Sequence, residues 1–203
     1  MENQNLLPVF IDKLINQLNK LPGIGSKTAQ RLALSILKKP DGYIENLVDS
    51  LNKVNTEVRL CNECQNYCES DLCLICQNEK RNSKSICVVE DILDLIAIEN
   101  SGVFKGKYFV LHGLISPLNG VLPSNTKVDL LCKKLNKVCT PTELILSLNS
   151  TSDGDATCHY INESLKNEMV SISKLASGLP FGSDLDYLDS RTLSQAIENR
   201  KSF

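Results

Sequence analysis

Residues 61–76 read CNECQNYCESDLCLIC and divide the chain into two parts with different hydrophobic patterns. On the N-terminal side, apolar residues recur every three or four positions, which predicts amphipathic helices over 6–18, 26–40 and 44–58. On the C-terminal side, short runs rich in valine, isoleucine and leucine alternate with helical patterns. The cysteine-rich stretch therefore separates a helical N-terminal region from a region of mixed strands and helices.

The same stretch contains two Cys-x-x-Cys turns separated by eight residues. Each turn can present two thiolates to one side, and two turns supply the four soft ligands that tetrahedral zinc prefers. Four cysteines leave no open coordination position, so the spacing predicts one structural Zn²⁺ per chain. The predicted ligands are Cys61, Cys64, Cys73 and Cys76. The alternative is a set of buried or redox-active thiols, and Cys68, between the turns, could replace a neighbour.

The region from residue 84 onward predicts an α/β domain. Strands are expected at 86–89, 108–111, 144–148 and 170–172, with helices at 91–99, 128–138 and 156–167. Strands that alternate with helices of this length are typical of a parallel sheet covered on both faces. The predicted fold class is α+β and multi-module: N-terminal helices, a cysteine module, an α/β domain with a parallel sheet, and a C-terminal tail.

Charge is distributed unevenly, although the formal net charge of the 203 residues is only -2. Residues 13–39 carry six basic residues and no acidic one, whereas residues 151–198 carry eight acidic and three basic residues. The basic segment could bind an anion and the acidic one a partner or a metal, or both could be solvated faces.

Composition excludes several classes of protein. A hydrophobic content of 42% with 23% charged residues is ordinary for a globular chain and excludes wholesale disorder. No apolar run approaches the roughly 18 residues that span a membrane, and no signal-peptide pattern is present, so we expect a cytoplasmic protein. Nine cysteines in such a chain argue against a disulfide framework. Those outside the module, Cys87, Cys132, Cys139 and Cys158, are expected to be small buried residues.

The segment LPGIGSKTAQRLA at 21–33 connects the first two predicted helices through Gly23 and Gly25. Glycine tolerates positive φ and lets the backbone approach another surface closely. Free N–H groups at the start of the second helix could hold a phosphate, and Lys27 and Arg31 would add charge on the same face. This pattern predicts a helix–hairpin–helix that binds nucleic-acid backbone without reading sequence. The alternative is a plain helix–helix turn with an incidental basic face.

Three carboxylates follow predicted strands. Glu90 ends the first strand, and Asp153 and Asp155 follow the third. The carboxyl ends of parallel strands line the functional crevice of such sheets, so these side chains are expected to converge. They could hold Mg²⁺ on a phosphate group. Alternatively, Asp153 and Asp155 could cap the next helix and favour its positive end.

In register over almost the whole chain, the sequence resembles the bacterial recombination mediator family RecR. The resemblance is carried by LPGIGSKTAQRLA at 21–33, the four-cysteine module, ICVVED at 86–91, YFVLHGLISPLNG at 108–120, LNSTSDGDAT at 148–157 and ISKLASGLPFGSDLDYLDSRTLSQAI at 172–197. It implies a helix–hairpin–helix region at 1–58, a C4 zinc finger at 59–78, a Toprim domain at 84–180 and a Walker-B-like motif with a tail helix at 181–203.

The resemblance also implies a non-enzymatic mediator of DNA repair and recombination in the bacterial cytoplasm, associated with the nucleoid. Family members form ring-like homotetramers able to encircle DNA. With RecO, and in some contexts RecF, they help load RecA onto single-stranded DNA. By position, Lys27 and Arg31 match basic residues implicated in DNA binding. Glu90, Asp153 and Asp155 occupy the Toprim acidic positions, a region that the family uses to contact RecO.

One departure from the family keeps a second hypothesis open. Asp153-Gly-Asp155 stands where family members commonly carry Glu-Gly-Glu, which makes the site more like that of a catalytic Toprim enzyme. The alternative function is a Mg²⁺-dependent Toprim nuclease or primase-like enzyme that uses these acids with Glu90. The first expectation is therefore a mediator that binds DNA independently of sequence. A bound Mg²⁺ ion belongs to the second, less favoured hypothesis.

Overall fold

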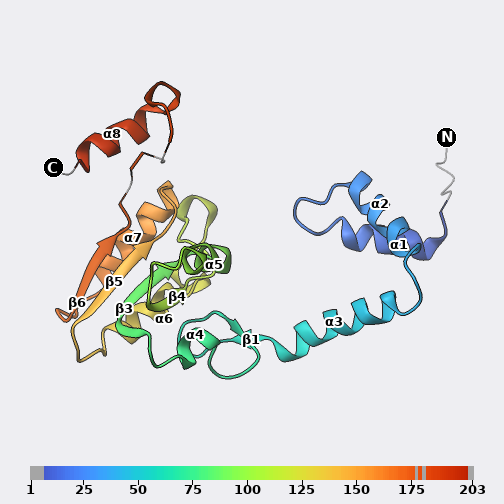
Figure 1. Ribbon diagram of the computed structural model, residues 1–203, viewed down its shortest axis with the longest axis horizontal. Helices are drawn as coiled ribbons and strands as arrows, with labels where there is room; N and C mark the ends of the chain where they lie inside the picture. Colours follow the sequence, from blue (N-terminus) through green and yellow to red (C-terminus); the bar gives the residue numbers. More distant parts are fainter. Residues whose placement is uncertain (1–6, 177, 180–181, 201–203) are drawn as a thin grey trace. The chain divides into compact units, whose positions relative to one another are not determined.

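The computed structural model describes residues 7–176, 178–179 and 182–200 (Figure 1). The chain divides into two compact units, Met1–Val58 and Arg59–Phe203. Within the described residues, no helix is both long enough and apolar enough to cross a membrane.

The described part of the N-terminal unit consists of α1 (Val9–Leu18), α2 (Ser26–Ile36) and α3 (Tyr43–Glu57). The first two helices pack against each other, and Ala29 and Ala33 on α2 are fully buried. These two residues lie one turn apart on the same face, where their small side chains allow close packing. The predicted pair of helices around the glycine turn is thus present.

The third helix carries the predicted apolar stripe but does not bury it. Ile44, Val48, Leu51 and Val54 are 44% to 62% exposed, and no residue of α3 is buried. A helix with one apolar stripe normally places that stripe against another element. The stripe of α3, defined by these four residues, therefore remains available for a partner.

The second unit begins with the cysteine module. β1 (Arg59–Leu60) and β2 (Tyr67–Cys68) form an antiparallel ribbon, and the short helix α4 (Leu74–Gln77) follows. The cysteine side chains form a small core of their own, in which Cys61, Cys64 and Cys73 are buried.

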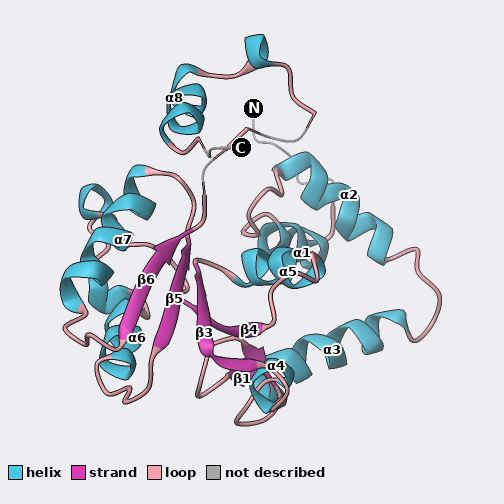
Figure 2. Cartoon of the chain, turned by 60° about the vertical axis from the view of Figure 1, so that its left-hand side comes forward, coloured by secondary structure: helices cyan, strands magenta, loops and turns pink. Residues whose placement is uncertain are grey.

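A four-stranded parallel sheet follows the module (Figure 2). Its strands are β3 (Asn82–Val89), β4 (Gly106–Val110), β5 (Thr142–Ser147) and β6 (Val170–Lys174), in the order β4-β3-β5-β6. The chain moves outward from β3 to β4 and then crosses to β5 on the other side. The strand order therefore reverses between β3 and β5, and the carboxyl ends of these two strands form the switch point where such sheets bind ligands.

Helices cover the two faces of the sheet unequally. Helices α6 (Val128–Leu135) and α7 (Ser152–Ser164) lie over the face that contains the larger core, with buried Val88, Leu144 and Leu146. Helix α5 (Ile92–Asn100) covers the other face at β3 and β4, around a second core. That core contains Cys87, Val89, Leu95, Tyr108 and Val110.

The prediction that helices cover both faces is confirmed at β3 and β4 only. On the α5 side of β5, half-buried Ile145 lines an open apolar hollow together with Cys87, Ile98 and Leu175. The other predicted elements after residue 84 are present, with ends that differ by no more than four residues from those expected. The fold class predicted from the sequence is confirmed.

Short 3₁₀ turns complete the second unit: η1 (Pro117–Asn119), η2 (Pro123–Asn125) and η3 (Leu185–Tyr187). The tail helix α8 (Ser190–Glu198) begins after Asp189, whose carboxylate accepts hydrogen bonds from the backbone N–H groups of Arg191 and Thr192. Phe181 and residues 201–203 of the predicted Walker-B-like segment and tail lie outside the described residues, as do Ser177 and Pro180 of the predicted Toprim domain.

Candidate nucleic-acid interface and metal centre

The turn between α1 and α2 depends on a glycine. Gly23 has φ +78°, a backbone conformation that side chains with a Cβ rarely adopt. The turn is closed by the Ile24 N–H, which donates to the Leu21 carbonyl at 3.1 Å. At Gly25 the backbone is extended, and an added Cβ would meet no atom within 4 Å. The backbone around both glycines is therefore open to a close approach from outside.

The N-terminus of α2 has no side-chain cap and no acidic residue in its first turn. The first N–H groups of a helix have no intrahelical acceptor, and together with the helix dipole they favour an anion. Lys27 and Arg31 are exposed on the first two turns, four positions apart and hence on one face. The predicted glycines and basic residues thus lie together at a helix end whose geometry suits an anion, with two cations on one face beside it.

The cysteine module brings together the four predicted ligands. The Sγ atoms of Cys61, Cys64, Cys73 and Cys76 all lie within 4.8 Å of one another, and those of Cys64 and Cys73 are 3.4 Å apart. Four sulfurs around a tetrahedral ion with bonds of about 2.3 Å would be about 3.8 Å apart. The donor set and its spacing therefore fit a four-coordinate thiolate metal centre.

The crowding of these sulfurs shifts the pKa values of neighbouring cysteines in opposite directions. A hydrogen bond from Cys64, followed by one from Cys76, lowers the pKa of Cys73 well below its usual range. The pKa of Cys64 rises because its thiol donates to Cys73 and because it is buried. The backbone N–H of Cys73 donates to the Cys61 sulfur at 3.3 Å. The pKa of Cys76 is also raised, so the geometry favours a thiolate at Cys73 alone, stabilised by the neighbouring thiols. The thiolate is the form that binds metal.

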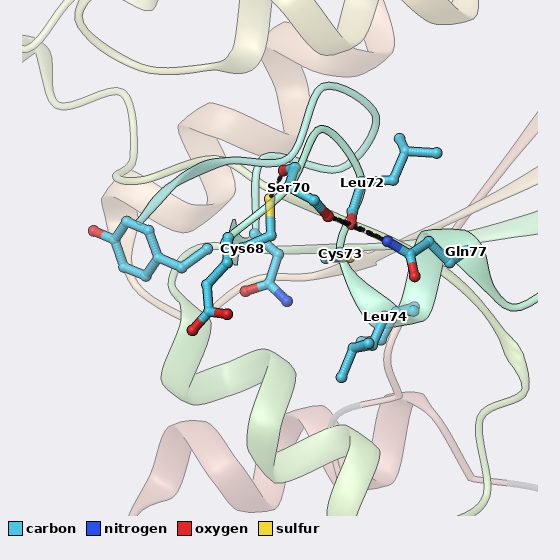
Figure 3. A pocket seen from close by; sticks show the side chains of 10 residues that line it. Cys68, Ser70, Leu72, Cys73, Leu74 and Gln77 are labelled. Atoms are coloured by element: carbon cyan, nitrogen blue, oxygen red, sulfur yellow. Dashed lines mark hydrogen bonds between the residues drawn. The ribbon is translucent and has the colours of Figure 1, made fainter. Parts of the chain in front are cut away.

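Cys68 does not belong to the metal-binding group. Its thiol donates to the Ser70 carbonyl at 2.8 Å, and burial raises its pKa. It lines a hollow of about 510 Å³ beside the centre, which Figure 3 shows from close by. Across this hollow, the Gln77 side-chain amide donates to the Leu72 carbonyl at 2.7 Å. The four cysteines predicted from the spacing of the Cys-x-x-Cys turns are therefore the four that converge.

The acidic residues at the switch point are held by different partners. The Asn149 amide donates to Glu90 at 2.9 Å, and Lys174 and Arg191 contact the two oxygens of Asp155 at 2.7 and 3.3 Å. The hydrogen bond from Lys174 lowers the pKa of Asp155. Among the described residues, the cysteines are the one set of three or more metal-binding side chains that converge. The expected three-carboxylate group for Mg²⁺ is therefore not present in this geometry.

The Asp-Gly-Asp segment is shaped by the start of α7. Thr151, which the sequence analysis missed, caps this helix by accepting a hydrogen bond from the Gly154 N–H at 3.1 Å. A Cβ at Gly154 would lie 2.0 Å from the Asn149 carbonyl oxygen, so the close approach requires glycine. Asp153 and Asp155 lie in the first turn and favour its positive end, but neither is the cap residue.

The remaining cysteines have different environments. Cys87 and Cys132 are buried, and burial raises the pKa of each to about 11. Cys158 is half-buried. The prediction of a buried residue is wrong for Cys139, which is exposed because it follows the end of α6 in a loop.

Three protein-family models match successive parts of the chain. The model described as RecR, helix-hairpin-helix, matches residues 11–54. The Toprim domain model matches residues 84–176, and the model described as RecR, C-terminal, matches residues 178–201.

Curated relatives match almost the whole chain. A protein named recombination protein RecR from Bdellovibrio bacteriovorus is 42% identical over 195 residues, which are 94% of this chain and 96% of the relative. Proteins of the same name from Dehalococcoides mccartyi and Hahella chejuensis are each 42% identical over 193 residues. These alignments cover 95% of this chain and 94% and 96% of the two relatives.

Proposed function

The chain belongs to the RecR family of recombination proteins, and on this premise we propose that it binds DNA as an oligomeric ring and acts with RecO and RecF to help load RecA onto single-stranded DNA. It is a DNA repair and recombination protein and not an enzyme. The observation that carries the DNA-binding proposal is the uncapped N-terminus of α2 with Lys27 and Arg31 beside it. Contacts of this kind bind the phosphate backbone without regard to sequence.

The experiment is a salt titration of DNA affinity. Each phosphate contact contributes about 0.9 to the slope of log affinity against log salt for duplex DNA, and about 0.7 for single strands. The double variant Lys27→Ala/Arg31→Ala is expected to bind DNA of any sequence more weakly and to flatten the slope by about 1.4 for single strands and about 1.8 for duplex DNA. Fluorescence anisotropy with labelled oligonucleotides measures both quantities.

A matched control removes two charges from the other end of the same helix region. Lys38→Ala/Lys39→Ala lowers the net charge of the unit equally but leaves the N-terminus of α2 intact. We expect the DNA affinity and the salt slope of this control variant to be close to those of the unaltered protein. Equal losses of DNA affinity in the two double variants would assign the effect to net charge alone. An unchanged salt slope in Lys27→Ala/Arg31→Ala would contradict the assignment of DNA binding to these two residues.

We also propose that the chain forms a homo-oligomer, with a tetramer as the expected state. The exposed apolar stripe of α3 supports this, because a second copy could bury it. Leu51→Glu is expected to lower the molecular mass measured by sedimentation velocity, whereas Asn52→Glu, on the neighbouring face, is not. A monomer in the unaltered protein would contradict the proposal.

The proposed RecO contact uses the acidic switch point. Its support is the concentration of carboxylates there, including Glu90 and Asp153, which would attract a basic surface and orient its approach. Asp153→Asn is expected to weaken binding of purified RecO without changing DNA binding by the chain alone. Unchanged RecO binding would place that contact elsewhere. We do not favour the nuclease or primase-like alternative, since its three carboxylates do not converge as a metal-binding group.

For the metal centre we propose one structural Zn²⁺ per chain. A closed set of four buried or half-buried thiolates is typical of structural zinc sites. The ion would stabilise the cysteine module and would have no catalytic role. Elemental analysis of the purified protein tests this, and a metal other than zinc or none at all would contradict it. The proposed module boundaries are those expected from the sequence, and the proposed location is the bacterial cytoplasm.

A further inference from the structure

Two lysines outside the cysteine module each contact one Cys-x-x-Cys turn. The ammonium group of Lys134, on α6, donates to the backbone carbonyls of Asn62 and Glu63 at 3.0 and 2.8 Å, and to the Glu63 carboxylate at 3.0 Å. Asn62 and Glu63 are the two residues between the first pair of cysteines. All three N–H donors of this lysine therefore have acceptors in the first turn.

The second turn has an equivalent contact. The ammonium group of Lys107, on β4, donates to the carbonyls of Ile75, Cys76 and Asn78 at 2.9, 3.0 and 2.9 Å. These carbonyls lie within and just after the second cysteine pair, around the C-terminal end of α4. A cation at this position satisfies carbonyls that have no intrahelical donor. Each turn is thus held by one ammonium group.

Both lysines belong to the Toprim part of the second unit, so they connect the module to the sheet. Two further contacts do the same: the Val110 N–H at the end of β4 donates to the Cys64 carbonyl at 2.8 Å, and the His112 ring nitrogen Nε2 lies 2.6 Å from the Gln65 carbonyl. The module is therefore docked on the edge strand β4 through polar contacts made largely to its own backbone.

The lysine contacts have a direct consequence for a bound ion. A divalent ion with four thiolates carries a net charge of about -2, and such charge is stabilised by nearby cations and oriented hydrogen bonds. Two ammonium groups lie close to the two turns, and the Glu63 carboxylate, which pairs with Lys134, offsets one of their two positive charges. The 3.3 Å contact from the Cys73 N–H to the Cys61 sulfur adds one oriented backbone donor, independent of the two lysines.

We propose that Lys107 and Lys134 are positioning residues of the metal centre, each fixing one Cys-x-x-Cys turn and offsetting the charge of the thiolates. Retention of the ion then depends on β4 and α6, which lie outside the module in sequence. This inference rests on the proposed zinc assignment. It adds that the Toprim sheet and the metal centre stabilise each other.

The test measures zinc retention by the full-length protein. Lys107→Met and Lys134→Met keep the length of the side chain and remove its charge. Competition with a coloured chelator is expected to show about 10- to 100-fold weaker zinc binding in each variant, as found when residues that support metal ligands are changed. Matched controls are Lys105→Met, just before β4, and Lys133→Met, on α6; both alter exposed lysines and should retain zinc normally.

A second readout separates loss of zinc affinity from loss of fold. At saturating zinc, the melting temperature of Lys134→Met should stay near that of the unaltered protein, and the absorption of the cobalt-substituted site should shift because the thiolates are less restrained. Lys134→Arg keeps the charge at a partly exposed site and should restore part of the affinity. Zinc retention equal to that of the controls, or an Arg variant as weak as the Met variant, would overturn the proposal. An unaltered protein without zinc would instead overturn the zinc assignment.

Discussion

The glycine turn of the N-terminal unit and the cysteine module of the second unit differ in how far their backbone polar groups have hydrogen-bond partners within the protein. At the start of α2, N–H groups are left without a side-chain cap, and the surrounding residues are exposed. In the cysteine module, carbonyls of both Cys-x-x-Cys turns accept hydrogen bonds from lysines, and the sulfurs contact one another. An interface for a ligand keeps its polar groups accessible, whereas a structural centre satisfies them internally.

The comparison predicts that the largest effect comes from breaking the module. Cys64→Ser replaces a soft thiolate with a hydroxyl that binds zinc poorly, and it should abolish stoichiometric metal binding. Because metal binding to such modules contributes on the order of 10 kcal/mol to their folding, the module should become susceptible to proteolysis around residues 59–78. Elemental analysis and limited proteolysis measure both effects. Cys139→Ser, at an exposed position, is the control, and a Cys64→Ser protein with a full complement of metal would contradict the structural role.

A smaller loss of stability is expected when an ion pair between the sheet region and α5 is removed. Arg81 makes a bidentate ion pair with Glu99, with distances of 2.6 and 2.8 Å between the guanidinium nitrogens and the carboxylate oxygens. The Tyr108 hydroxyl donates to the same carboxylate at 2.8 Å. Glu99→Gln removes the charge from this partly buried network and should lower the free energy of unfolding by about 2 kcal/mol. Chemical denaturation measures the change. A loss below about 0.5 kcal/mol would show that the pair acts like an exposed ion pair.

The same pair gives stability a pH dependence. The hydrogen bond from Arg81 lowers the pKa of Glu99 in the folded state. This contribution is therefore complete above the unfolded-state pKa of about 4.3, and it is lost as pH falls through the lower folded-state pKa. On acidification below about pH 4.3, the unaltered protein should lose more stability than Glu99→Gln. If the free energy of unfolding of the two proteins falls by the same amount over this pH range, this prediction is wrong.

The smallest effect on stability is expected at the glycine turn. Gly23→Ala places a Cβ at φ +78° and should destabilise the N-terminal unit by about 1 kcal/mol. At Gly25, φ is -79° and the surroundings are open, so Gly25→Ala should change stability by less than about 0.5 kcal/mol. Thermal unfolding followed by helical circular dichroism compares the two. Equal losses would show that the turn does not depend on positive φ at Gly23.

Local patterns predicted the elements of both regions well. The doubled Cys-x-x-Cys spacing identified the four converging cysteines, because each pair is only three residues apart and its geometry is local. The turn at Gly23 was equally predictable, since its backbone requirement concerns a single residue. The alternation of strands and helices likewise indicated the parallel sheet and its order of elements along the chain.

Contacts between distant residues were beyond the sequence patterns. Lys107 lies in a strand and Lys134 follows Lys133 in a helix, and nothing in the neighbouring sequence indicates that they contact the cysteine turns. The carboxylates show the converse: Glu90, Asp153 and Asp155 follow adjacent strands, yet Asn149, Lys174 and Arg191 hold two of them separately. Strand order alone brings side chains to one edge of the sheet, but it does not choose their hydrogen-bond partners.

The sequence by itself thus determined the helices, the strands, the metal-binding cysteines and the resemblance to RecR, all of which depend on spacing or short motifs. Only the tertiary structure decided that α3 leaves its apolar stripe exposed, that the acidic residues do not form a metal-binding group, and that two lysines hold the cysteine turns. The physical reason is the distance along the sequence over which each kind of interaction acts. Backbone preferences and cysteine spacing act over a few residues, whereas burial, ion pairing and hydrogen bonding to the module depend on which distant segments the fold brings together.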